Sequence, residues 1–166
     1  MNQRILCPVD LSECSHAALA HALILAKAGN SQLDVLHAFY VPENIQPHLL
    51  VWAATGPRPV QQIAEEQAKR DLDEFLARHG ADIAQRIDLH VVHKDPTSAI
   101  LDFAAEHGSS LIVMGTHGRT GAPRLFLGSV AERVVRRSPC PVLTVHSPPE
   151  PIVTAQPNQP NASLAT

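Results

Sequence analysis

Short apolar runs alternate with segments of helical spacing along most of this chain, and this alternation restricts the fold more than any other feature. Apolar runs bounded by glycine, proline or acidic residues are typical of buried parallel strands. Five strands are predicted, at residues 5–9, 33–39, 87–92, 111–114 and 141–145. Because a helix-like segment separates each strand from the next, the chain predicts an α/β fold. The expected architecture is an open five-stranded parallel sheet with helices on both faces and right-handed crossovers.

The predicted helices carry start and stop signals. They lie within residues 12–29, 60–79, 95–108 and 128–138. Ser12 can cap the first helix, and Gly29-Asn30 ends it. Asp95 followed by Pro96 is a start signal, because the aspartate can cap the first turn and proline suits its first position.

The stretch between Tyr40 and Pro59 does not fit the alternation. It contains four prolines and the only tryptophan, Trp52. We predict a long loop here, and loops of this length are usually functional. Two roles remain open for it, a cover over a ligand or a flap that binds a partner.

Composition and charge exclude several classes of protein. The chain has 166 residues, a formal net charge of −3 and 45% hydrophobic residues, which indicates one folded domain and no nucleic-acid partner. It has no apolar run of membrane-spanning length and no signal-peptide pattern at its start, so we expect a soluble cytoplasmic protein without a membrane partner. Three cysteines and ten histidines show no metal-ligand spacing, so no metal site is predicted. The domain is predicted to span residues 1–147, and the proline-rich residues 148–166 to form a disordered tail.

A glycine-bearing segment carries the clearest chemistry. Residues 115–121 follow the fourth apolar run, and Gly128-Ser129 opens the last helix. Glycines let backbone N–H groups approach an anion, and a helix N-terminus favours negative charge. The segment therefore predicts a phosphate cradle, with Arg119 and Arg124 as its cations. It is not a Walker loop, because Gly-Lys-Ser/Thr occurs nowhere in the chain.

Simpler interpretations of the same residues stay open. The segment could be only a strand-to-helix connection, with Ser129 and Glu132 forming a capping box for the last helix. Asp10, which ends the first strand, could cap the first helix together with Glu13 instead of contacting a ligand.

At this point the sequence resembles the universal stress protein family. The pattern Gly115-x2-Gly118-x9-Gly128-Ser129 is similar to the motif of its ATP-binding branch. Residues 5–10 resemble the family's first strand with its terminal acidic residue, and residues 138–143 resemble its last strand. The resemblance covers roughly residues 3–146. The departure is at Lys94-Asp95-Pro96, where many relatives have a glycine before the acidic residue.

The resemblance implies a strand order of 3-2-1-4-5 and an adenine-nucleotide site where the first and fourth strands meet. It places the base and ribose near one group of residues and the phosphates near another. The residues implied at the base and ribose are Pro8, Val9, Asp10, Ala38, Met114 and Gly115, and those implied at the phosphates are Gly118, Gly128, Ser129 and Val130. His117 and Arg119 of the glycine-bearing segment complete the predicted site residues.

The resulting functional prediction is a stress-response protein that binds ATP, with or without Mg²⁺. It is not expected to be an enzyme beyond slow hydrolysis, because efficient hydrolysis needs a positioned water, a base and charge compensation. The strand at residues 141–146 is expected to pair two copies into a homodimer, and an unknown protein would be the downstream partner. The alternative is a dimeric interaction module that binds no nucleotide and uses residues 40–59 to contact partners.

Overall fold

The computed structural model describes residues 3–41, 45–53, 56–78, 87–116 and 127–146. Its main sheet contains five parallel strands, β1 (Arg4–Val9), β2 (Gln32–Phe39), β5 (Ile87–His93), β6 (Leu111–Gly115) and β7 (Val142–Val145). The helices of the described residues are α1 (Glu13–Gly29), α2 (Val60–Ala77), α3 (Pro96–Glu106) and α4 (Ser129–Arg137). The predicted tail, residues 148–166, lies outside the described residues.

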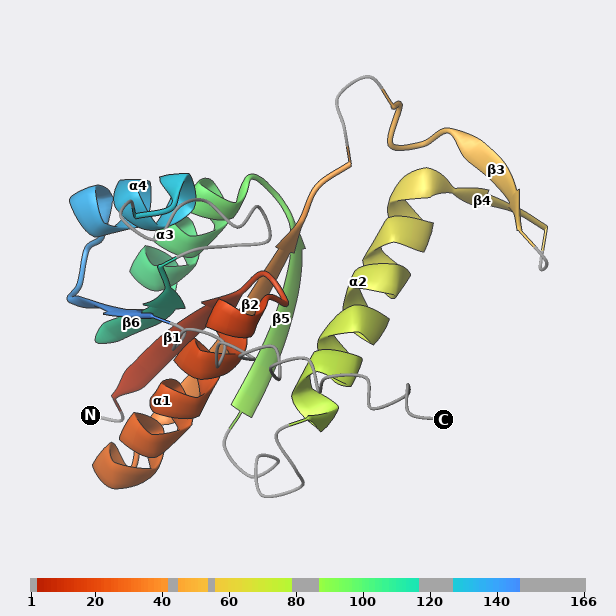
Figure 1. The fold of residues 1–166 in the computed structure, drawn as a ribbon. Coiled ribbons are helices and arrows are strands. Elements are labelled where there is room, and N and C mark those ends of the chain that lie inside the picture. Colours follow the sequence, from red (N-terminus) through yellow and green to blue (C-terminus); the bar gives the residue numbers. More distant parts are fainter. Residues whose placement is uncertain (1–2, 42–44, 54–55, 79–86, 117–126, 147–166) are drawn as a thin grey trace, which may run out of the picture.

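The sheet has the order β5-β2-β1-β6-β7. Numbered along the chain without the β3–β4 hairpin described below, this is the predicted order 3-2-1-4-5, so the predicted fold is confirmed. Figure 1 shows α1 and α2 against one face and α3 and α4 against the other. None of the described helices has the length and apolar character needed to cross a bilayer.

Alternation along β1 explains why both faces of the sheet are covered. Ile5, Cys7 and Val9 pack with α1 and α2 in one buried cluster, whereas Leu6 packs with α3 and α4 in the other. Successive side chains of a strand point to opposite faces, so a fully apolar strand needs helices on both sides.

The predicted helix signals act as expected. The Ser12 side chain accepts a hydrogen bond from the Ser15 N–H at the start of α1. Asn30 ends that helix in the left-handed conformation, with a φ of 51°. Asp95 Oδ2 accepts from the Ser98 N–H at 2.9 Å, which caps α3.

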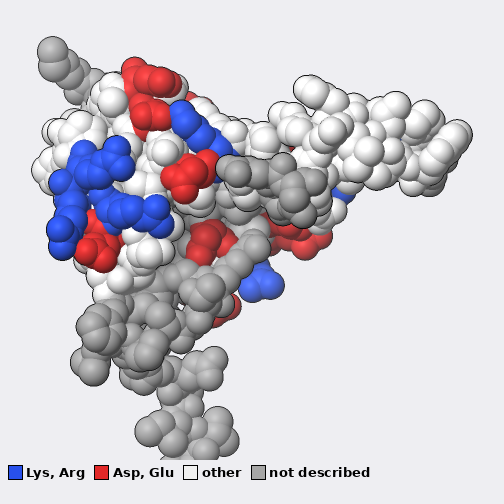
Figure 2. Space-filling model, turned by 90° about the horizontal axis from the view of Figure 1, so that it is seen from above, with Lys and Arg blue, Asp and Glu red and all other residues white. Residues whose placement is uncertain are grey.

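The predicted long loop between Tyr40 and Pro59 is wrong in part, because it contains a β-hairpin. Strand β3 (Leu50–Ala53) pairs antiparallel with β4 (Gly56–Pro59). The pattern was hidden because β4 reads Gly-Pro-Arg-Pro, a composition that disfavours strands unless the prolines lie at an edge. The hairpin projects from the body of the molecule in Figure 1 and, seen from above, in Figure 2.

Candidate functional site

A cavity of about 330 Å³ opens at the carboxyl ends of the strands. It lies where β1 separates β2 from β6, the point at which strand order reverses and ligands of open α/β sheets usually bind. The first turns of α3 and α4 complete its wall, since Pro96 and Ser129 line it.

Nine of the twelve predicted site residues line this one cavity. They come from the end of β1, the end of β2, the end of β6 and the start of α4: Pro8, Val9, Asp10, Ala38, Met114, Gly115, Gly128, Ser129 and Val130. The remaining three, His117, Gly118 and Arg119, lie outside the described residues, as does Arg124.

Six lining residues were not predicted from the sequence. These are Ser15, Leu36, Pro96, Ile100, Thr116 and Ala131. Pro96 and Ile100 could have been found, because the cap signal at Asp95 places the start of α3 at the carboxyl end of the sheet. Leu36 carries no such signal, since a leucine inside a buried strand reads as ordinary core.

The N-terminus of α4 presents backbone N–H groups beside the cavity. Its first internal hydrogen bond runs from the Glu132 N–H to the Gly128 carbonyl, at 2.9 Å. The N–H groups of Ser129, Val130 and Ala131 therefore lie outside the helix's own hydrogen bonds. Gly128 is the N-cap of α4 and no side chain caps the helix, so the alternative interpretation of Ser129 and Glu132 as a capping box is wrong. Glu132 pairs instead with Arg136 at 3.1 Å.

Asp10 is the one ionisable side chain among the described lining residues. Its Oδ1 accepts hydrogen bonds from the Ser12 hydroxyl and the Ser15 hydroxyl, each at 2.6 Å, and from the Ser12 N–H at 3.1 Å. Ser12, not Asp10, caps α1. Asp10 is thus held in a fixed position at the end of β1 by the first turn of α1.

Position 115 requires glycine because of its packing against Cys14, and not only because of the predicted ligand contact. A Cβ at this position would lie 2.9 Å from the Cβ of Cys14 and 3.1 Å from its backbone carbonyl carbon. The end of β6 therefore approaches the start of α1 more closely than any other residue type permits. This contact brings the two strand ends that border the cavity together.

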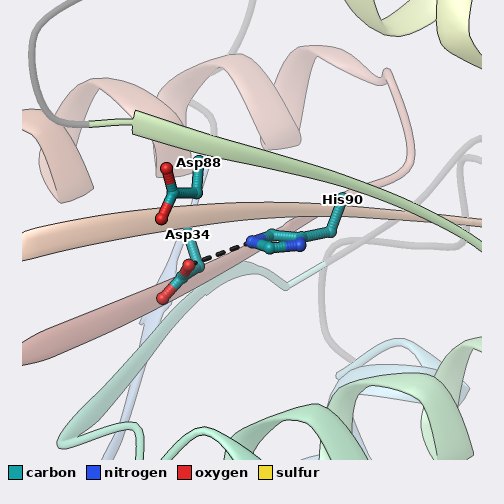
Figure 3. Close-up of side chains that lie close together, drawn as sticks. All are labelled: Asp34, Asp88 and His90. Carbon is teal, nitrogen blue, oxygen red and sulfur yellow. Dashed lines mark hydrogen bonds and ion pairs between the residues drawn. The ribbon is translucent and has the colours of Figure 1, made fainter.

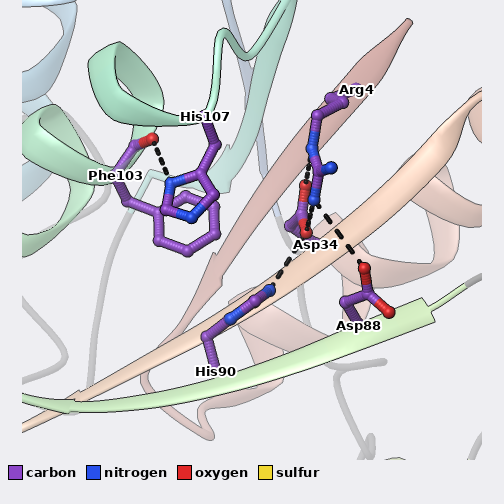
Figure 4. Close-up of polar contacts among 6 residues, drawn as sticks. All are labelled: Arg4, Asp34, Asp88, His90, Phe103 and His107. Carbon is purple, nitrogen blue, oxygen red and sulfur yellow. Dashed lines mark hydrogen bonds and ion pairs between the residues drawn. The ribbon is translucent and has the colours of Figure 1, made fainter. Parts of the chain in front are cut away.

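A second polar cluster lies toward the other end of the sheet. Asp34 of β2 is completely buried, and Arg4 binds both of its oxygens, with Nη2–Oδ1 at 2.6 Å and Nε–Oδ2 at 2.9 Å. His90 of β5 lies 3.0 Å from Oδ1 through its Nε2 (Figures 3 and 4). The hydrogen bonds from Arg4 to Asp34 raise the pKa of the guanidinium above its ordinary value.

The same cluster has the spacing of a metal site, but Arg4 fills the place of the cation. Ligand atoms of Asp34, Asp88 and His90 all lie within 4.8 Å of one another. Nη2 of Arg4 lies 2.6 Å from Asp34 and 3.7 Å from Asp88, so a positive charge already stands between the two carboxylates (Figure 4). We assign the cluster to stability and not to ligand binding.

The match to a protein family decides the classification. A model of the universal stress protein family matches residues 1–146, which contain every described strand and helix. The chain belongs to the universal stress protein family.

Relatives within the family are similar along most of their length. Universal stress protein MJ0531 of Methanocaldococcus jannaschii is 32% identical over 146 residues, covering 88% of this chain and 83% of the relative. Universal stress protein YxiE of Bacillus subtilis is 30% identical over 161 residues, covering 87% of this chain and 99% of the relative.

Solved structures of the family share the fold. Universal stress protein UspA from Lactobacillus plantarum superposes with a TM-score of 0.68 at 22% identity, covering 86% of this chain and 97% of that one. A universal stress protein solved in complex with cAMP superposes with a TM-score of 0.54 at 24% identity, covering 89% of this chain and 98% of that one.

Proposed function

We propose that this member of the universal stress protein family binds an adenine nucleotide, with ATP as the first candidate, in the cavity at the ends of β1 and β6. The observation that carries the proposal is the convergence of four separate chain segments, predicted from the sequence, around one cavity beside a helix N-terminus. A nucleotide needs both features, an apolar recess for its base and N–H donors for its phosphates.

The two kinds of lining suggest how the nucleotide lies. Phosphates fit the first turn of α4, where the N–H groups of Ser129, Val130 and Ala131 are available. The base and ribose fit the other part, where Ala38 and Met114 are apolar and Asp10 offers an acceptor to hydroxyl or amine groups. A carboxylate beside phosphates would repel them, so Asp10 belongs at the nucleoside end.

We propose binding with at most slow hydrolysis. Phosphoryl transfer depends on positioning and on positive charge at the γ-phosphate. The described lining offers neither a lysine nor an arginine nor a histidine, and its carboxylate is held by Ser12 and Ser15. Mg²⁺ would enter with the phosphates, because it usually keeps several waters and few protein ligands.

Thermal unfolding with ATP, ADP, AMP and cAMP, each with and without Mg²⁺, tests the proposal. A nucleotide at 100 times its Kd stabilises the fold by about 2.7 kcal/mol, which raises the Tm by roughly 5–10 °C. Val130→Asp, which puts a negative charge in the first turn of α4, should remove this shift. The matched control is Val135→Asp on the exposed part of the same helix, which should keep it. No shift with any nucleotide, or equal loss in both variants, contradicts the proposal.

We also propose that β7 pairs two copies into a homodimer. Among the described strands β7 is hydrogen-bonded only to β6, and its Leu143 is partly exposed. An apolar strand at the edge of a sheet favours pairing, and pairing with its own copy satisfies a two-fold axis. Sedimentation should show a twofold lower mass for Leu143→Lys than for wild type, and Leu143→Thr should keep the wild-type mass. An unchanged mass in the lysine variant contradicts this interface.

A further inference from the structure

The β3–β4 hairpin, here called the arm, exposes apolar side chains without charge. Leu50, Val51 and Trp52 are 59%, 37% and 86% exposed. Of the described residues of the arm only Arg58 is charged, and it forms an ion pair with Glu66 of α2. In Figure 2 the outer part of the arm shows neither basic nor acidic side chains on the face in view. Among the described residues, those of the arm are not part of the lining of the cavity.

The backbone of the arm leaves one edge open and blocks the other. The Val60 N–H donates to the Leu49 carbonyl, and antiparallel pairs alternate between bonded and non-bonded. Val51 and Arg58 therefore form the next bonded pair, and the N–H and C=O groups of Leu50 and Trp52 point away from β4. On β4 the residues opposite them are Pro59 and Pro57, which have no N–H to offer an incoming strand.

An arm of this kind needs a third strand. A two-stranded hairpin of four-residue strands is marginally stable in water unless more strands or a helix cover it. Contact with α2 is made through β4, at the base of the arm. No other described strand pairs with the open edge of β3.

The chemistry of the open edge favours a second copy of this chain as its occupant. Nucleic acids and anionic membrane surfaces attract basic groups, and the exposed part of the arm has none. If β3 meets its own copy about a two-fold axis at Val51, Leu50 lies directly opposite Trp52 of the second copy. Both residues have outward N–H and C=O groups, so this register satisfies all of them and gives an aromatic–aliphatic pair on each side.

We propose that β3 pairs antiparallel with β3 of a second copy, in the register Leu50 to Trp52, to form a four-stranded sheet between two molecules. This interface is independent of the nucleotide cavity and of the proposed β7 interface, because it lies on a different element. The arm interface alone gives a dimer, and together with the β7 interface, with the two two-fold axes at right angles, it gives a tetramer. Loss of the arm interface therefore halves the mass, whether the starting assembly is a dimer or a tetramer.

A charge placed on the two-fold axis tests the pairing. Val51→Lys puts like charges directly opposite each other, so sedimentation of the full chain should show a twofold lower mass than wild type. Val51→Thr keeps the strand and the size of the side chain, and it should keep the wild-type mass. Val51→Glu should behave like the lysine variant, and mixing the two should restore the mass. An unchanged mass in Val51→Lys, or no recovery on mixing, overturns the proposal.

A disulfide measures the register directly and does not depend on disrupting the arm. Val51 faces itself in a non-bonded pair, where Cα atoms lie about 4.5 Å apart, a distance that a disulfide can span. Val51→Cys should therefore give a covalent dimer under mild oxidation. Ala53→Cys, on the same strand and face, would lie about 14 Å from its copy in this register and should not react. The register is overturned if both variants form the covalent dimer equally. It is also overturned if Val51→Cys forms no more covalent dimer than wild type.

Discussion

The two ends of the parallel sheet use their polar groups in opposite ways. Toward the amino end, the buried carboxylate of Asp34 forms an ion pair with Arg4 and lies 3.0 Å from His90 Nε2. At the carboxyl end, Asp10 is held in place beside a cavity, and the first N–H groups of α4 have no partner within their own helix. Charge that is neutralised inside the fold contributes stability, whereas donors that the fold leaves available can contribute binding.

The topology of the sheet explains why the cavity lies at the carboxyl end and not at the amino end. Crossovers from β1 and β6 leave in different directions at the carboxyl end, because the strand order reverses there, and this opens a space between them. At the amino end Arg4, the first residue of β1, reaches Asp34 on the neighbouring strand β2, so a side chain links the two strands there.

The largest effect is expected when the ion pair between Arg4 and Asp34 at the amino end of the sheet is removed. Arg4→Ala leaves the buried Asp34 without its cation, which should cost about 3 kcal/mol of unfolding free energy in urea. The control is Asp88→Asn, since Asp88 is exposed and 3.7 Å from Arg4, and it should cost less than about 0.5 kcal/mol. Equal small losses in both variants would show that the amino end is not stabilised by this ion pair.

At the carboxyl end, the largest expected loss comes from Gly115→Ala. The added Cβ would meet Cys14 at 2.9 Å, so we expect about 2 kcal/mol of destabilisation by urea unfolding. Adding Cys14→Ala should not restore stability, because the contacts are with the Cβ and backbone that alanine shares. Wild-type stability in Gly115→Ala would contradict the close approach of α1 and β6.

Cys7 of β1, between the two ends of the sheet, should make the free energy of unfolding decrease at alkaline pH. Burial raises the pKa of its thiol from 9.0 to about 12. The unfolded chain therefore releases this proton first, so the contribution is complete below pH 9 and is lost as pH rises toward 12. Wild type should lose about 1.4 kcal/mol more per pH unit in this window than Cys7→Ala. Parallel pH profiles of the two proteins would show that the thiol is not shielded from water.

The smallest expected effect contrasts α3 and α4, two of the helices that border the cavity. Helix α3 is capped by Asp95, whereas α4 has no side-chain cap. Asp95→Ala should destabilise the protein by about 1 kcal/mol in urea, because a first-turn N–H of α3 loses its acceptor. Ser98→Ala is the control, since only the backbone N–H of Ser98 takes part in the cap, and it should leave stability nearly unchanged.

The cavity shows how far local sequence patterns can predict a site. Strand ends and helix starts are local features, so Asp10, Gly115 and Ser129 could be placed at one edge of the sheet once the alternation of elements was recognised. Ser15 and Leu36 could not be predicted from local patterns. They line the cavity only because of how α1 packs on the sheet and how far β2 extends beside β1. The predicted contacts of His117, Gly118 and Arg119 remain predictions.

By itself, the sequence determined the alternating elements, the caps at Ser12 and Asp95, and the edge of the sheet at which a ligand could bind. Each of these depends on residues a few positions apart, where periodicity and capping act directly. Only the tertiary structure decided the hairpin of β3 and β4, the burial of Asp34 and the need for glycine at position 115. Arg4 and Asp34 are 30 residues apart, and no local pattern predicts their contact. The physical reason is that a strand pairing or a buried charge is stabilised by partners that the chain brings together only on folding.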